Sequence, residues 1–166
     1  MPMSDYLREI RRMIGTHRIM MPAVSAVIIN DKREVVLHRA ADDGNWYVIG
    51  GAPDPGEPPA LAAAREAFEE TGLIVVPEKL LGVYVDPLRI YPNGDEVMYT
   101  AMSFRCRPIG GELKVADDES LEVKYFPVDR LPEQNLDSAQ RLKIEHAVAD
   151  RSSGYFAWDE AWLKNL

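Results

Sequence analysis

The chain has 166 residues, of which 46% are hydrophobic and 28% charged, and it carries a formal net charge of −8. A chain of this length can bury an adequate core, and we expect one domain over residues 1–166. The acidic balance argues against non-specific binding to nucleic acids and anionic membranes, because both are negatively charged. It does not exclude a phosphate-bearing ligand, since bound metal ions can reverse the local field.

Cysteine content and hydropathy bear on the cellular location of the protein. The single cysteine, Cys106, excludes an internal disulfide. Together with the lack of a signal-like leader, it leads us to expect a reducing environment and a cytoplasmic location. Cys106 has no neighbouring base and no CxxC partner, so we interpret it as a strand residue and not as a nucleophile. The longest apolar stretch, residues 20–29, is too short to span a bilayer.

The first third of the chain predicts one helix followed by short strands. Ser4 can cap an amphipathic helix that runs to about Ile14, which we treat as an appendage at about 4–14. Residues 23–29 are typical of a buried strand, and a turn then leads to residues 34–39, which we expect to pair back as a hairpin. Residues 46–49 predict a short strand that leads into a Gly-Gly loop.

A helix is predicted next, over residues 60–71, which are rich in strong helix formers. Pro58 and Pro59 suit its first turn, and Gly72 suits a left-handed residue at its end. At about 100° per residue, three apolar side chains form a stripe that we expect to face a core: Leu61, Ala64 and Phe68.

Three glutamates, Glu66, Glu69 and Glu70, lie on the opposite face of this predicted helix. Like charges at these spacings destabilise a helix and raise one another's pKa. A bound divalent cation reverses that penalty, and an all-oxygen ligand set favours Mg²⁺ or Mn²⁺ over softer metals. The alternative interpretation is a solvated acidic face, which would not need glycines, an arginine and a further glutamate at fixed offsets.

The second half of the chain is mostly β-rich. Residues 80–90 and 96–107 predict two strands joined by an Asn-Gly turn. Residues 121–126 predict another strand, and Asp137 can cap a helix over residues 138–149. This mixed order of strands and helices is typical of an α/β/α sandwich.

The C-terminal tail, residues 150–166, is rich in aromatic residues, with Trp158 and Trp162 four positions apart. A helical turn would align these two side chains. Three interpretations are open: the tail docks on the surface of its own domain, it exchanges onto a dimer partner, or it forms a lid over a nucleobase. Exposed strands or the N-terminal helix could also support a homodimer.

The most informative segment is Gly51 to Leu73, which reads GAPDPGEPPALAAAREAFEETGL. It matches the pattern G-x5-E-x7-R-E-U-x-E-E-x-G-U at every fixed position; U is aliphatic, and the first U is the small Ala67. The segment therefore resembles the Nudix box of the MutT-like Nudix hydrolases, and the similarity covers about residues 23–131. The resemblance implies a Nudix-type α/β/α sandwich with a mixed β-sheet between helices.

The resemblance also implies the reaction. Nudix hydrolases cleave a nucleoside diphosphate linked to another moiety, X, by attack of water on phosphorus in a step that depends on Mg²⁺ or Mn²⁺. ADP-ribose, nucleotide sugars and dinucleoside polyphosphates are substrates of this type. The nearest alternative is a nucleoside triphosphate pyrophosphohydrolase that removes damaged nucleotides. A non-catalytic nucleotide sensor is a third class, which the intact box disfavours.

Roles for the box glutamates follow from the resemblance. Glu66, Glu69 and Glu70 match the metal-binding glutamates, and Glu66 is either a ligand or the general base. Glu57 would bind the metal through water or from a second sphere. We assign catalytic roles to Glu66, Glu69 and Arg65, with Glu119 as a further catalytic candidate.

The remaining box positions have supporting roles. Arg65 matches an arginine that orients a box glutamate, a task that suits a bidentate guanidinium. Gly50 and Gly51 let the backbone approach a metal, because glycine has no Cβ. The approach to the box departs from the common W-x-L-P-G-G, since Ile49 stands where a proline is usual. This loosens a rigid turn and puts catalytic efficiency, more than the chemistry, in doubt.

Several candidates lie outside the box. Glu119, in an acidic loop, is an additional metal ligand or base, or an ordinary loop residue. Arg39 could reach substrate phosphates or form a surface ion pair, and Trp46 could stack on a base or pack beside the box. Tyr91 and Arg89 could contact substrate or a second subunit. The three histidines lack metal-ligand spacing, and we interpret each as structural or exposed: His17, His38 and His146.

Overall fold

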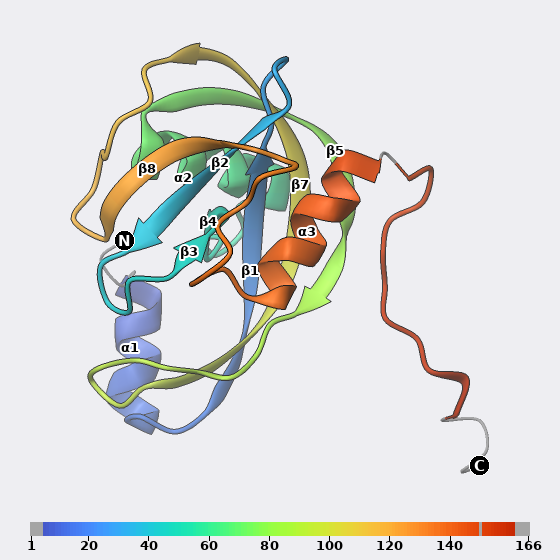
Figure 1. The fold of residues 1–166 in the computed structure, drawn as a ribbon. Helices are drawn as coiled ribbons and strands as arrows, with labels where there is room; N and C mark the ends of the chain where they lie inside the picture. Colours follow the sequence, from blue (N-terminus) through green and yellow to red (C-terminus); the bar gives the residue numbers. More distant parts are fainter. Residues whose placement is uncertain (1–4, 150, 162–166) are drawn as a thin grey trace.

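The computed structural model describes residues 5–149 and 151–161 (Figure 1). The α-helices in these residues are α1 (Asp5–Ile14), α2 (Pro59–Thr71) and α3 (Ser138–Ala149). The first four strands are β1 (Ile19–Ile28), β2 (Glu34–Ala40), β3 (Trp46–Tyr47) and β4 (Ile49–Gly51). The later strands are β5 (Leu73–Val85), β6 (Arg89–Ile90), β7 (Glu96–Gly111) and β8 (Ser120–Pro127).

The strands form two sheets. The larger sheet has the order β4-β1-β7-β5, with β6 paired to β7 beside this path. β1 runs parallel to β7, whereas all other strand pairs in this sheet are antiparallel, so the sheet is mixed. The smaller sheet has the order β3-β2-β8 and is antiparallel. The mixed sheet between helices confirms the predicted α/β/α class.

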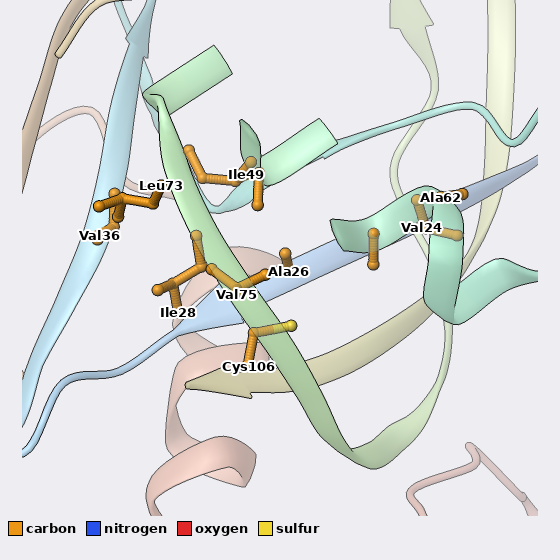
Figure 2. Packing of buried hydrophobic residues seen from close by; sticks show 11 residues of the cluster. Val24, Ala26, Ile28, Val36, Ile49, Ala62, Leu73, Val75 and Cys106 are labelled. Atoms are coloured by element: carbon orange, nitrogen blue, oxygen red, sulfur yellow. The ribbon is translucent and has the colours of Figure 1, made fainter. Parts of the chain in front are cut away.

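Helices α2 and α3 cover opposite faces of β1. Successive side chains of a strand point to opposite faces. Val24, Ala26 and Ile28 pack with the alanines of α2 in one buried cluster (Figure 2). Val27 packs instead with Ile144 of α3 in a second cluster. The core therefore has two halves, separated by the larger sheet, and the central strand serves both.

The ends of α2 form as the sequence predicts. Pro59 is the first helical residue, where a missing N–H costs little. Gly72 ends the helix in the left-handed conformation, with φ 72°, and its N–H donates to the Phe68 carbonyl at 2.9 Å. A residue with a Cβ would be disfavoured at this φ.

The predicted core-facing side of α2 is wrong at Leu61 and Phe68, whereas Ala64 is half-buried and packs against the core. Leu61 and Phe68 are 58% and 56% exposed. The buried face carries small and acidic residues, namely Ala62, Ala63, Glu66, Ala67, Glu70 and Thr71. Alanines let the helix backbone lie close to the sheet, and this proximity pushes the glutamates toward the strands. Amphipathicity failed as a guide because two carboxylates, Glu66 and Glu70, occupy the inward face.

The predicted hairpin between residues 23–29 and 34–39 is also wrong. The two segments share only one isolated bridge, Ile29 to Val35. Both edges of β1 are already taken, by β4 on one side and β7 on the other. Because a strand has only two edges, β2 leaves the larger sheet and pairs with β3 and β8.

The predicted strand at residues 46–49 is divided between the two sheets. Tyr47 pairs with β2, whereas Ile49 pairs with β1. Between them, the Val48 N–H donates to the Gln140 side-chain oxygen at 3.2 Å. The helix over residues 138–149 is confirmed as α3, and its first turn is capped by Asp137, which accepts the Gln140 N–H at 2.8 Å.

Helix α1 is fixed against the turn that joins β6 to β7. Arg11 donates to the His17 carbonyl at 2.8 Å and to the Glu96 carbonyl at 3.3 Å, and its Nε lies 3.4 Å from Asp95. The expected cap at Ser4 lies outside the described residues. None of the described helices has the length and apolar character needed to cross a membrane.

The tail docks on the domain through Tyr155. Its N–H donates to the Leu81 carbonyl at 2.7 Å, and its carbonyl accepts the Val83 N–H at 3.0 Å. Its ring stacks on Tyr84 with a centroid distance of 5.0 Å. Phe156 and Trp158 stay 72% and 60% exposed, and the tail runs outside the domain beside α3 and β5 (Figure 1). Trp162 lies outside the described residues.

Candidate active site

A cleft of about 690 Å³ lies beside the buried face of α2. Its walls come from all parts of the chain, including α1, the inner strands, α2, the β6–β7 region and α3. Representative lining residues are Ser25, His38, Gly50, Glu66, Glu70 and Lys143. A cleft of this size fits a nucleotide-sized ligand.

Glu66 and Glu70 form the acidic end of the cleft. They are 0% and 6% exposed. Burial disfavours the charged form, so it raises the pKa of Glu66 to about 7 and raises the pKa of Glu70 well above its usual value. One carboxylate oxygen of each, Oε2, is buried and accepts no hydrogen bond from the described residues. Two such oxygens are costly in a protein interior unless a cation or donor engages them.

His38 adds no positive charge to this end. Its Nδ1 lies 3.7 Å from Glu70 Oε2 and 3.0 Å from Ser120 Oγ. Burial lowers the pKa of His38 to about 4, so the ring is neutral near pH 7. The contact with Glu70 is therefore not an ion pair at that pH. Glu70 needs another source of positive charge if it is to ionise.

Arg65 gathers the other box carboxylates. Its Nε and Nη2 donate to the two oxygens of Glu57 at 2.9 and 2.8 Å, a bidentate pair. Its Nη1 donates to Glu66 Oε1 at 3.1 Å and to Glu69 Oε2 at 3.0 Å. These hydrogen bonds lower the pKa of Glu57. Arg65 thus fixes the rotamer of Glu66 and leaves its Oε2 directed elsewhere.

The paired glycines allow close packing at this end. A Cβ on Gly51 would collide with the Glu66 carboxylate, and a Cβ on Gly50 would collide with the Val24 carbonyl oxygen. Gly50 also stabilises the charged form of Glu70 through its backbone N–H. The glycines therefore bring β4 against both β1 and the α2 carboxylates.

The donor set fits a hard divalent cation. Glu66 and Glu70 supply carboxylate oxygens, which Mg²⁺ and Mn²⁺ prefer. In the described part of the chain, no group of three or more His, Cys, Asp or Glu side chains is close enough to hold a metal ion alone. Mg²⁺ usually keeps several waters and binds through one or two carboxylates together with substrate phosphates. Two free carboxylate oxygens meet that requirement.

The NUDIX domain family model matches residues 20–146 of the chain. The chain belongs to the Nudix family. Hydrolases of this family act on small nucleotide substrates and generally use a divalent metal. The match begins after α1 and ends within α3, so α1 and the tail lie outside it.

Relatives within the Nudix family differ in the substrates that their names state. The chain is 35% identical over 123 residues to the ADP-ribose pyrophosphatase of Methanocaldococcus jannaschii, covering 73% of this chain and 70% of that protein. It is 36% identical over 115 residues to the 8-oxo-dGDP phosphatase NUDT18 of Homo sapiens, covering 66% of this chain but only 33% of that protein. These named relatives establish a hydrolase of the pyrophosphatase type.

The fold is shared with solved Nudix structures. A UDP-X diphosphatase structure matches with a TM-score of 0.63 and 24% identity, over 88% of this chain and 70% of that chain. Identity at this level supports the fold alone. The predicted Nudix-type architecture is therefore confirmed.

The candidates outside the Nudix box divide into two groups. Glu119 and Tyr91 line the cleft. Arg39 and Trp46 are both described and lie outside it: Arg39 donates to the Gly44 carbonyl at 3.1 Å, and Trp46 packs edge-on against Phe126 at 4.9 Å. The β-bulge after Arg39 turns that side chain toward its own loop.

Glu69 is separated from the other two α2 glutamates. Its side chain is 45% exposed, and it lines an adjoining open groove together with Asp117. Glu70 borders both the groove and the cleft. The three carboxylates of α2 therefore do not all face one opening: Glu66 lines the cleft, Glu69 lines the groove, and Glu70 lies between the two.

Sequence reasoning missed several cleft residues. Tyr47, Gln140 and Lys143 line the cleft, and Arg11 of α1 reaches it from the other side. The only available signals were a buried lysine on α3 and the alternation that turns Tyr47 away from Trp46. Their convergence depends on contacts between residues distant in sequence.

Proposed function

We propose that the protein is a divalent-metal-dependent pyrophosphohydrolase that cleaves a nucleoside diphosphate linked to another moiety. The observation that carries this proposal is the pair of buried carboxylate oxygens, Oε2 of Glu66 and of Glu70, beside a nucleotide-sized cleft. A structural role would have matched each oxygen with a donor.

The box residues would divide the work. Glu66 and Glu70 would hold the metal, Glu69 would join them only by turning from the adjoining groove toward the cleft, and Glu57 would lie in a second sphere. When bound there, a divalent cation such as Mg²⁺ or Mn²⁺ neutralises the diphosphate and lowers the pKa of a coordinated water. Arg65 keeps Glu57, Glu66 and Glu69 in place through hydrogen bonds to each of them.

The proton from the attacking water needs an acceptor. Glu66 is one candidate, because a pKa of about 7 suits a general base near neutral pH. Glu119 is the second, since it lines the same cleft from the β7–β8 loop. The backbone of Gly50 and Gly51 borders the same end of the cleft and would approach the metal.

For the substrate, we propose an ADP-ribose, nucleotide-sugar or dinucleoside polyphosphate type. The similarity to the ADP-ribose pyrophosphatase of Methanocaldococcus jannaschii supports this class. The second candidate is hydrolysis of damaged nucleotides, which the 8-oxo-dGDP phosphatase relative favours. Tyr91 would contact the substrate in the cleft, whereas such roles for Arg39 and Trp46 would require both side chains to move from their present contacts.

We also propose that residues 1–166 form one Nudix domain with α1 and the tail as appendages, acting on a small nucleotide without a stable nucleic-acid complex. A cytoplasmic location is consistent with the buried thiol of Cys106, whose pKa burial raises to about 12. A homodimer remains a prediction of the sequence.

The test is turnover with Mg²⁺ on a panel of ADP-ribose, nucleotide sugars, diadenosine polyphosphates, NADH and normal and oxidised deoxynucleotides. Products formed in ¹⁸O-labelled water identify the phosphorus attacked. We expect metal-dependent cleavage of one class that is lost in Glu70→Gln. Nucleotide binding without any cleavage by the wild-type protein would replace the hydrolase with the sensor.

A further inference from the structure

The end of the cleft away from the carboxylates carries the positive charge. Among the described residues that line the cleft, three are lysine or arginine: Arg11, Arg89 and Lys143. Lys143 is 1% exposed and binds both oxygens of Asp86, at 2.9 and 3.0 Å. Arg11, whose side chain is 8% exposed, is held by backbone carbonyls and by Asp95. Lys143 is therefore paired within the fold, and Arg11 is buried against Asp95, although its Nε makes no hydrogen bond in the described part of the chain.

Arg89 differs from the other two. Its side chain is 31% exposed, and its one ion pair joins Nη2 to Asp42 Oδ2 at 2.7 Å. The guanidinium carbon lies 5.1 Å from the Tyr47 ring centroid and 4.9 Å from the Tyr91 ring centroid. Both rings lie within cation–π distance of the guanidinium, and its donors on Nε and Nη1 have no hydrogen-bond acceptor in the described part of the chain. A guanidinium offers five donors, so most of its capacity is unused.

A continuous line of side chains joins Arg89 to the reacting end. Glu70 lies 3.7 Å from His38, whose ring centroid lies 6.0 Å from that of Tyr47. Tyr47 in turn stacks on Arg89. Glu70, His38, Tyr47 and Arg89 all line the cleft. A ligand whose diphosphate lies at Glu70 can therefore extend one of its ends toward Arg89.

Asp42 occupies the position that a ligand anion would take. It lies on the turn between β2 and β3, and its side chain is 29% exposed. The neighbouring Asp43 is fixed by the Tyr47 hydroxyl at 2.6 Å and by the Asn45 N–H at 2.9 Å. In the described part of the chain, the Asp42 side chain makes one hydrogen bond, which it accepts from Arg89. Exposed single ion pairs of this kind are weak, so a better-placed anion can displace the carboxylate.

We propose that Arg89 recognises an anionic group on the substrate beyond the scissile diphosphate, and that Asp42 holds this anion position in the free protein. This inference rests on the proposed hydrolase function and names its substrate class: the X moiety carries a further phosphate or carboxylate. A guanidinium forms planar, two-point contacts with either group. Asp42 then acts as an internal competitor that the ligand anion must displace, whereas a substrate with a neutral X leaves the Asp42–Arg89 pair intact.

The test uses a matched pair of ligands, UDP-glucose and UDP-glucuronate, which differ by one carboxylate on X. Binding is measured by calorimetry in Ca²⁺ with the ligand verified as intact, and kcat/KM is measured in Mg²⁺ wherever cleavage occurs. The variants are Arg89→Gln, Arg89→Lys and Asp42→Asn. Matched controls are Arg107→Gln and Glu78→Gln, which break an exposed pair of similar length, 2.6 Å, between β7 and β5.

We expect Arg89→Gln to reduce the preference for UDP-glucuronate over UDP-glucose about 10-fold, the scale of a hydrogen bond to a charged group. Asp42→Asn should raise that preference about 3-fold, Arg89→Lys should retain part of it, and the two controls should leave it unchanged. An unchanged preference in Arg89→Gln, or no preference in the wild-type protein, overturns the inference. Loss of metal-dependent turnover on every substrate overturns the hydrolase instead, and the binding ratio still decides the role of Arg89.

Discussion

The two ends of the cleft are built in different ways. The acidic end comes almost entirely from one segment, residues 51–73, in which Arg65 bridges three glutamates within eight positions of itself. The basic end is assembled from separated segments: Asp42 and Tyr47 in one, Arg89 and Tyr91 in another. The residues to which we assign the reaction chemistry are thus close together in sequence, whereas the contacts that we assign to substrate selection depend on the tertiary fold.

This difference has a consequence for variation. Loops are exposed and tolerate change, so the basic end can alter its ligand while the acidic end keeps its geometry. Nudix relatives whose names state ADP-ribose and 8-oxo-dGDP as substrates agree with this division. Substitutions at the acidic end should therefore affect kcat, and those at the basic end should affect which ligand is preferred.

The largest expected effect is at Glu70. Glu70→Gln removes a buried carboxylate with an unpaired oxygen, so we expect kcat to fall by more than about 100-fold, the scale for a main electrostatic element. Turnover and thermal melting are measured together. Glu145→Gln, on the exposed surface of α3, is the control. Near-normal turnover by a folded Glu70→Gln protein would contradict the assignment of Glu70 to the metal site.

Gly51 tests how tightly that end is packed. Gly51→Ala places a Cβ against the Glu66 carboxylate, and we expect kcat to fall by about 10- to 100-fold through displacement of Glu66. Gly56→Ala is a less crowded control, because a Cβ at Gly56 meets no described atom within 4 Å, although its φ of 83° adds local strain. Equal kinetics for Gly51→Ala and the wild-type protein would show that Glu66 need not be held so closely.

Arg65 should act through position and not through contact with the substrate. Arg65→Lys keeps the charge but cannot form the bidentate pair with Glu57, so we expect kcat to fall about 10-fold with little change in KM. Steady-state kinetics with the identified substrate separate the two constants. A large rise in KM at constant kcat would instead place Arg65 at the substrate.

The raised pKa of Glu66 predicts a pH effect on stability. The folded protein retains a proton on Glu66 up to about pH 7, whereas the unfolded chain releases it near the usual glutamate value of 4.5. Without divalent metal, stability should therefore fall as pH rises between these two values, by at most about 3 kcal/mol. Melting in chelator from pH 5 to 8 measures this. Glu66→Gln should flatten the dependence, and an identical slope in that variant would reject the cause.

The smallest expected effect is at the tail, which lies away from both ends. Deleting residues 154–166 removes the backbone bonds and stacking of Tyr155, and we expect the Tm to fall by about 2–4 °C with unchanged KM. Gly82→Ala, whose Cβ would collide with the Tyr155 carbonyl, should produce a similar loss in the full-length chain. A changed elution volume would support exchange onto a dimer partner, and a selectively raised KM would support a lid.

Local signals predicted much of the fold. The ends of α2 follow from Pro59 and Gly72, and the start of α3 follows from Asp137, because each acts on backbone groups within a few residues. Local signals could not predict the pairing of β1 with β7, because residues 19–28 and 97–106 are far apart in the sequence. The expected hairpin failed for the same reason: a distant strand competed for the edge of β1.

Prediction of the site shows the same limit. The box pattern identified Glu66, Glu70 and Arg65, because fixed spacing on a helix sets their relative positions. The apolar stripe of the same helix gave a wrong prediction, because Leu61 and Phe68 were expected to face the core and are exposed. Residues at the basic end carry no spacing rule, so only the folded chain brings them together.

The most direct test of the acidic end is a crystal structure with Mn²⁺, using anomalous scattering to locate the metal. We expect an anomalous peak within ligand distance of Glu66 Oε2 and Glu70 Oε2, on the cleft side of Gly50. The same crystals of Glu70→Gln should show that peak reduced or absent. A peak confined to the groove at Glu69 and Asp117, or no peak near α2 at saturating Mn²⁺, would contradict the assignment of these carboxylates to the metal.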